Sequence, residues 1–152
     1  MRSCITALFV LLVLPVAALA AEPKAVPDEE AAVEEAAREF GRALTSAELS
    51  RLKPLLPRRG KVHLRLEHLG PEQGSFSAGQ VLALLDDFLT VGKVRSFKLS
   101  PRCEGDRRKY TVVRGQAAVT DRDGRDVLIE LRLTIVPEDG RWILREIRET
   151  PL

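Results

Sequence analysis

Apolar residues recur at helical spacing in three parts of the chain after residue 27. Asp28 stands where a helix cap is expected, and the residues that follow form one apolar stripe: Val33, Ala36, Ala37, Phe40, Ala43 and Leu44. The stretch 45–48 reads Thr-Ser-Ala-Glu, a capping box that predicts a second, short helix closed by Pro54 and Pro57. A second box, Ser-Ala-Gly-Gln at 77–80, predicts a third helix that ends near Gly92.

Elsewhere the apolar period changes to two, which is typical of strands with one buried face. Residues 61–67 predict a first strand, followed by a turn over 70–74. After Gly92 the pattern predicts strands only: 94–99, 109–119 with Gly115 as a bulge or kink, 127–135, and 142–148. Cys103 falls in a polar run that predicts a loop. The order helix, helix, strand, helix and antiparallel meander predicts an α+β domain, with its helices grouped on one side of a strongly bent antiparallel sheet.

The N-terminal residues have a different pattern. Arg2 precedes an apolar stretch over 5–16, and Ala18-Leu19-Ala20 supplies small residues for a cleavage site. This is the layout of a secretory signal peptide, and it is too short for a comfortable membrane span. We therefore expect 1–21 to be a cleaved signal, 22–27 a flexible leader and 28–152 one domain. The expected location is the periplasm or the exterior, with no stable membrane span after cleavage.

Composition narrows the classes of partner. The chain has 24 basic and 22 acidic residues, so its net charge is only +2. Nucleic-acid binders show a dominant basic face, and this balance argues against one. Cleavage would remove Cys4 and leave Cys103, so no internal disulfide is expected. An intermolecular disulfide, a reactive thiol and a cysteine without a role remain alternatives for Cys103.

Candidate chemistry is sparse. The chain has no HExxH, CxxC, phosphate-binding glycine loop or G-x-S-x-G, so we expect no metal and no cofactor. His63, Asp87 and Tyr110 are candidates for acid–base work. The respective alternatives are a solvated charge network, a solvent-facing helix side and a packed ring. Two basic clusters, Arg58-Arg59 and Arg107-Arg108, are candidates for binding an anionic ligand or partner. A solvated rim is the alternative for both.

Two stretches resemble the nuclear transport factor 2-like superfamily of cone-shaped (cystatin-like) domains. The first is Gly-Ser-Phe-Ser-Ala-Gly-Gln at 74–80 with the helix face at 84–89, and the second is Asp-Gly-Arg-Trp-Ile-Leu at 139–144. The chain also looks like a family of uncharacterised exported bacterial proteins with this fold. The resemblance covers 28–149, and it implies helices on a curved sheet around a cone cavity. It says little about chemistry, because the superfamily includes isomerases, dehydratases, cyclases and inactive members.

Our hypothesis is an exported, non-catalytic binding or interaction domain of the bacterial cell envelope. It would hold a small apolar ligand in the cone cavity, or a protein partner on the exposed sheet face that carries Glu130, Arg132 and Thr134. Homodimerisation through the sheet is a further expectation from the resemblance. The alternative is a small isomerase- or cyclase-like enzyme with Asp87, His63 or Tyr110 in the cone.

Overall fold

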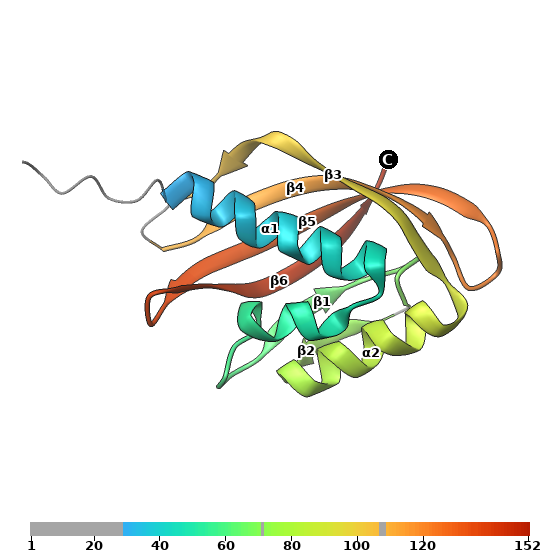
Figure 1. Ribbon diagram of the computed structural model, residues 1–152, viewed down its shortest axis with the longest axis horizontal. Coiled ribbons are helices and arrows are strands. Elements are labelled where there is room, and N and C mark those ends of the chain that lie inside the picture. Colours follow the sequence, from blue (N-terminus) through green and yellow to red (C-terminus); the bar gives the residue numbers. More distant parts are fainter. Residues whose placement is uncertain (1–28, 71, 107–108) are drawn as a thin grey trace, which may run out of the picture.

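The computed structural model describes residues 29–70, 72–106 and 109–152 (Figure 1). The elements follow in the order α1 (Glu29–Ser46), the 3-10 helix η1 (Leu49–Leu55), β1 (Val62–Arg65), β2 (Gln73–Phe76), α2 (Ala78–Val91), β3 (Lys93–Glu104), β4 (Thr111–Thr120), β5 (Asp126–Glu138) and β6 (Arg141–Pro151). The predicted signal peptide and leader lie outside the described residues. Within those residues, no helix is both long and apolar enough to cross a membrane.

The strands form one sheet of six in the order β2-β1-β6-β5-β4-β3. The α+β class is confirmed, but the sheet is mixed, because β1 runs parallel to β6. The local alternation in 61–67 could not reveal this pairing, since its partner lies some eighty residues later. Register shifts interrupt the β3–β4 and β5–β6 ladders, and such bulges increase the twist of a sheet. The expected curvature therefore has a visible cause.

The helices lie on one face of the sheet, where α1 crosses the strands and η1 and α2 lie beside it (Figure 1). Their apolar stripes meet the inward-facing positions of the strands in a single core. The largest fully buried side chains are Phe40, Phe88, Leu44, Leu52, Leu64, Leu69, Leu85, Ile129, Leu131, Leu133, Ile135 and Ile143.

Phe97 of β3 is held between α1 and β4 by two glycines. A Cβ atom at Gly41 would lie 2.1 Å from Cδ1 of Phe97, and one at Gly115 would lie 2.4 Å from its Cζ. The ring also meets Phe40 edge-on, at 6.1 Å between centroids. Gly115 is thus a point of close approach in β4. The irregularity predicted there begins at the pair Leu99–Gly115 and ends at the pair Cys103–Val113, with the extra residues on β3.

The third predicted helix is confirmed as α2, including its cap. The Ser77 hydroxyl accepts a hydrogen bond from the N–H of Gln80, and the Gln80 side chain accepts one from the N–H of Ser77. At the other end the N–H of Gly92 bonds the Phe88 carbonyl. Gly92 has an extended backbone, and its lack of a side chain matters because a Cβ would lie 2.4 Å from the Phe88 ring.

Three local predictions were wrong. The capping box at 45–48 does not form, because α1 continues to Ser46 and the Thr45 hydroxyl donates back to the Gly41 carbonyl at 3.0 Å. Ala47, with φ at 57°, then reverses the chain into a 3-10 helix. The expected turn at 70–74 contains the start of β2, and Cys103 lies in β3 rather than in a loop.

Candidate functional site

The concave side of the sheet, where a cone cavity was expected, is filled by side chains. Phe40 and Leu44 of α1 and Phe88 of α2 have at most 1% of their surface exposed, and they pack in one cluster with the inward-facing residues of β5. The larger open hollows are therefore to be sought at the surface of this core.

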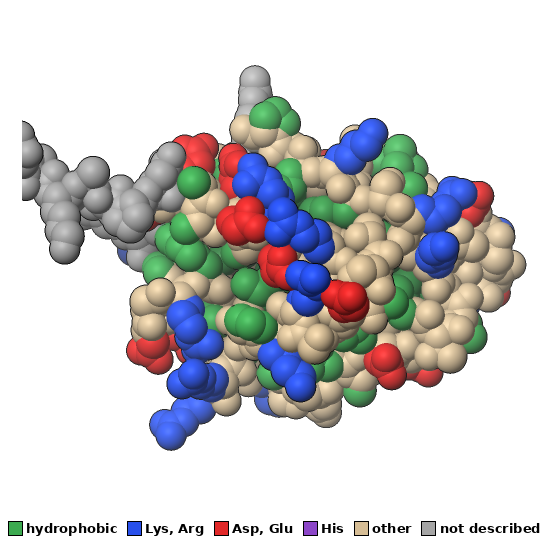
Figure 2. Space-filling view, in the orientation of Figure 1, with side chains coloured by type: hydrophobic (Ala, Val, Ile, Leu, Met, Phe, Trp, Pro, Cys, Tyr) green, Lys and Arg blue, Asp and Glu red, His purple; other side chains and the backbone are tan. Residues whose placement is uncertain are grey.

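One such hollow lies between the first half of α1, the end of η1 and the β5–β6 hairpin. It encloses about 530 Å³, within the range of about 300–1,000 Å³ that is typical of small-molecule pockets. We call it the Trp142 groove, and its lining residues are Ala32, Glu35, Ala36, Glu39, Pro54, Leu55, Arg141 and Trp142. Figure 2 shows hydrophobic side chains gathered here, below the row of charged side chains that follows α1.

The floor of the Trp142 groove is apolar. Ala36, Leu55 and Trp142 are half-buried and pack against the core from outside, so each presents one face to the hollow. Trp142 is also the only tryptophan in the chain. An aromatic ring and short aliphatic side chains without competing polar groups favour a ligand with an apolar body.

The acidic rim of the groove is engaged in ion pairs. Arg42 donates to Glu35 at 2.7 Å and to Glu39 at 3.0 Å, and Arg51 donates to Glu39 at 2.8 Å. These hydrogen bonds lower the pKa of Glu39, through Arg51 first, and that of Glu35, through Arg42 first. Both carboxylates therefore stay ionised at neutral pH and are poorly suited to act as general acids.

Comparison with known proteins gives matches at the level of structure only. No protein-family model matches the chain, and no curated protein matches it in sequence. A DUF4783 family protein from Bacteroides ovatus is 18% identical, with a TM-score of 0.58 over 75% of this chain and 93% of that one. A proposed dehydratase of the nuclear transport factor 2-like family from Streptomyces avermitilis is 14% identical, with a TM-score of 0.61 over 82% and 96%.

This chain has the nuclear transport factor 2-like fold. The resemblance seen in residues 74–80 and 139–144 is confirmed at that level. Identities this low establish the fold alone, and the fold hosts many chemistries. In the described part of the chain the core of this scaffold is packed, and the Trp142 groove lies at its surface.

The three acid–base candidates lie on different parts of the chain, on β1, on α2 and before β4, and none lines the Trp142 groove. His63 is on the exposed face of β1, with a ring nitrogen 3.4 Å from the Ser75 hydroxyl. Asp87 is exposed on α2 and is ion-paired with Arg122 at 2.5 Å, so it is not the buried carboxylate that a cone-mouth base requires. Tyr110 is 43% exposed and precedes β4. The structure does not bring these residues together.

The basic candidates are only partly described. Arg58 and Arg59 are exposed in the segment between η1 and β1. Arg107 and Arg108 lie outside the described residues, so a role for the two clusters in binding an anionic ligand or partner stays a prediction.

Sequence reasoning missed a buried carboxylate near the end of β6. The side chain of Glu149 is 3% exposed and accepts hydrogen bonds from the backbone N–H groups of Glu67 at 3.0 Å, His68 at 2.9 Å and Leu69 at 3.3 Å. The His68 ring, through Nδ1, is its fourth partner. Strand alternation was the available signal, because Glu149 has the parity of the buried Ile147. Its bonds bind the loop after β1 to β6.

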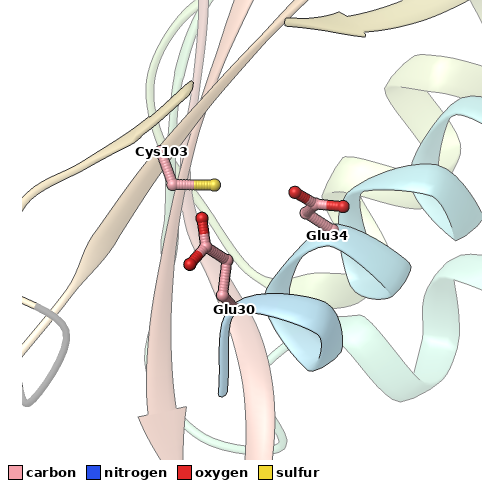
Figure 3. Close-up of side chains that lie close together, drawn as sticks. All are labelled: Glu30, Glu34 and Cys103. Atoms are coloured by element: carbon pink, nitrogen blue, oxygen red, sulfur yellow. The ribbon is translucent and has the colours of Figure 1, made fainter. Parts of the chain in front are cut away.

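Figure 3 shows a second cluster, in which Glu30 and Glu34 of α1 point toward Cys103 of β3. One donor atom from each lies within 4.8 Å of the others, and all three residues are half-buried. Closed zinc sites use four protein ligands, and Glu34 is already ion-paired with Arg38 at 2.6 Å. These three donors do not by themselves define a metal centre.

Proposed function

We propose that the protein is an exported, non-catalytic binding domain of the bacterial cell envelope that holds a small apolar ligand in the Trp142 groove. The observation that carries this proposal is the groove itself, which has an apolar floor that includes Trp142. The interior of the cone, by contrast, is filled by core side chains. The proposal moves the expected ligand from the interior of the cone to its surface.

The ion-paired rim is also unsuited to general acid catalysis. Glu35 and Glu39 hold their charges in pairs with arginines, which leaves them without a proton to transfer at neutral pH. The isomerase- or cyclase-like alternative depends on His63, Asp87 or Tyr110, and these residues lie away from the groove. The enzyme alternative would therefore require catalysis at a place other than the Trp142 groove, because none of these three residues lines it.

Trp142 allows a direct test, because it is the only tryptophan in the chain and it lines the groove. N-phenyl-1-naphthylamine, a neutral apolar probe, should quench Trp142 emission in a saturable manner by energy transfer. Ala32→Gln places a longer side chain in the groove and should weaken this binding. Ala31→Gln is the matched control, since Ala31 is exposed on the same turn of α1 but does not line the groove.

Absence of saturable quenching in the wild type, or equal binding by Ala32→Gln and Ala31→Gln, would contradict the proposed ligand site. Native mass spectrometry of protein from its own envelope is the complementary measurement, because it detects a retained ligand, a protein partner or a homodimer. Export is tested separately by intact mass: cleavage near Ala21 or Glu22 is expected, and an uncleaved N-terminus in the envelope fraction would contradict it.

A further inference from the structure

Four arginines from four neighbouring strands lie opposite one another in the sheet. Arg65 of β1 pairs in register with Arg148 of β6, Arg148 with Arg132 of β5, and Arg132 with Arg114 of β4. These strands are adjacent in the middle of the sheet (Figure 1). Because neighbouring strands are about 4.8 Å apart, the four backbone positions span about 14 Å. We call these residues the arginine row.

Folding alone does not favour such a row, because like charges directly opposite each other on a sheet are destabilising. Acidic neighbours compensate the charge of only two of the four arginines. Arg148 pairs with Glu146 at 2.7 Å, and Arg114 with Glu104 at 3.0 Å and with Glu130 at 3.9 Å.

The other two members of the row have no such compensation. Within the described part of the chain, no acidic side chain lies within ion-pair distance of Arg65 or Arg132. Two of the four cations are thus available to a ligand.

A hollow of about 520 Å³ opens beside these two arginines, where β1 ends. Arg65, Arg132 and Arg148 line it together, and Gln73 and Thr150 add neutral hydrogen-bonding groups. Leu66, Glu67 and Glu149 complete its wall. The charge of Glu149 is already compensated by the backbone N–H groups of the loop after β1, so it opposes an incoming anion less than its formal charge suggests.

We infer that this hollow is a binding site for a small oxyanion that carries at least two acidic groups, either carboxylates or phosphates. The guanidinium fork of arginine matches both groups with paired N–H donors. Arg65 and Arg132 are two strand spacings apart, about 10 Å between their backbones, with Arg148 between them. One acidic group can meet one unpaired arginine, whereas a ligand with two can bridge both. The site shares no residue with the Trp142 groove, so the two proposals stand or fall separately.

Isothermal titration calorimetry at low ionic strength tests this inference with three probes: citrate, pyrophosphate and acetate. Citrate or pyrophosphate should bind at one site, and acetate more weakly than either. The better of the first two identifies whether carboxylate or phosphate is the recognised group. Added salt should weaken the binding, as expected of an exposed charged site.

Arg132→Gln and Arg65→Gln should each weaken the tighter of citrate and pyrophosphate by about 10- to 100-fold, the effect of one charge-assisted hydrogen-bonded pair. Arg95→Gln is the matched control, because Arg95 is exposed on β3 and belongs neither to the hollow nor to the row. It should bind as the wild type does.

Thermal unfolding separates a ligand site from a structural one. The unliganded Arg132→Gln variant should unfold at the wild-type temperature or above it, because a like charge has been removed from the row. Citrate or pyrophosphate should raise the unfolding temperature of the wild type but not of the variant. Should Arg132→Gln fold poorly, Arg65→Gln decides. No saturable binding by the wild type, equal binding of acetate, or unchanged affinity in both variants overturns the inference.

Discussion

Replacing Glu149 with glutamine perturbs a carboxylate that is almost fully buried and accepts three backbone N–H groups. Glutamine keeps one acceptor oxygen, but its amide places a donor where the loop after β1 already presents donors. Hydrogen bonds to a charged group contribute about 1.5–3 kcal/mol each, and breaking a buried charged contact costs about 3–5 kcal/mol.

We therefore expect Glu149→Gln to lower the free energy of unfolding by about 3–5 kcal/mol. This is a large share of the roughly 5–15 kcal/mol that is typical of a domain. Urea unfolding followed by Trp142 fluorescence measures the change. Glu130→Gln is the matched control on the neighbouring strand β5, because Glu130 is half-buried and its nearest cation, on Arg114, is 3.9 Å away. That variant should lose less than about 1 kcal/mol.

His68→Ala divides the contribution of Glu149 between backbone and ring. It removes the imidazole and keeps the N–H groups of the loop, so it should cost less than Glu149→Gln. The reasoning fails if Glu149→Gln is no more destabilising than Glu130→Gln. If His68→Ala lowers the free energy of unfolding as much as Glu149→Gln does, the ring rather than the backbone N–H groups supplies most of the stabilisation, which would also contradict the reasoning.

Two further predictions concern packing and pH. Gly41→Ala should destabilise the protein by about 1–3 kcal/mol because the new Cβ meets Phe97, although alanine favours a helix by about 1 kcal/mol. In a Phe97→Ala background the same change should become stabilising. An equal cost in both backgrounds would contradict the close contact between Gly41 and Phe97. Hydrogen bonding from the backbone N–H of Arg125 lowers the pKa of Asp121, so this carboxylate should stabilise the fold above about pH 4 and cease to do so as the pH falls through its lowered pKa. Urea unfolding should accordingly show that Asp121→Asn is destabilised at pH 7 but not at pH 2. Asp86→Asn, at an exposed position, is the control and should match the wild type at both pH values. Equal stability of the two variants at pH 7 would contradict the stabilising role of the Asp121 carboxylate.

Elements whose signals are local were predictable from the sequence. The Ser77–Gln80 box and the apolar face after it specify α2 within fifteen residues, and β5 follows an unbroken alternation from Val127 to Ile135. Local signals failed where two local preferences compete. The capping box at 45–48 does not form because α1 continues through it. The Thr45 hydroxyl donates to the Gly41 carbonyl within α1 instead of capping a new helix.

Features that depend on distant contacts were not predictable in the same way. The Trp142 groove forms only where α1, η1 and the β5–β6 hairpin come together, and the local sequence of each segment does not indicate its contact with the other two. The arginine row depends on the register of four strands, and the parallel β1–β6 pair within it joins residues about eighty positions apart. Glu149 was within reach, since alternation from Ile147 gives it a core-facing position.

The parallel pairing of β1 with β6 has a consequence for the order of events during biogenesis. Among the described strands, β2 pairs only with β1, and β1 has β6 (Arg141–Pro151) as its other neighbour. The sheet therefore cannot be completed until β6, which ends at Pro151, is available, and such long-range closure is slow. A chain that is threaded through a membrane pore must stay unfolded during its passage. If the protein is exported as proposed above, this topology would delay stable folding until most of the domain has crossed the membrane.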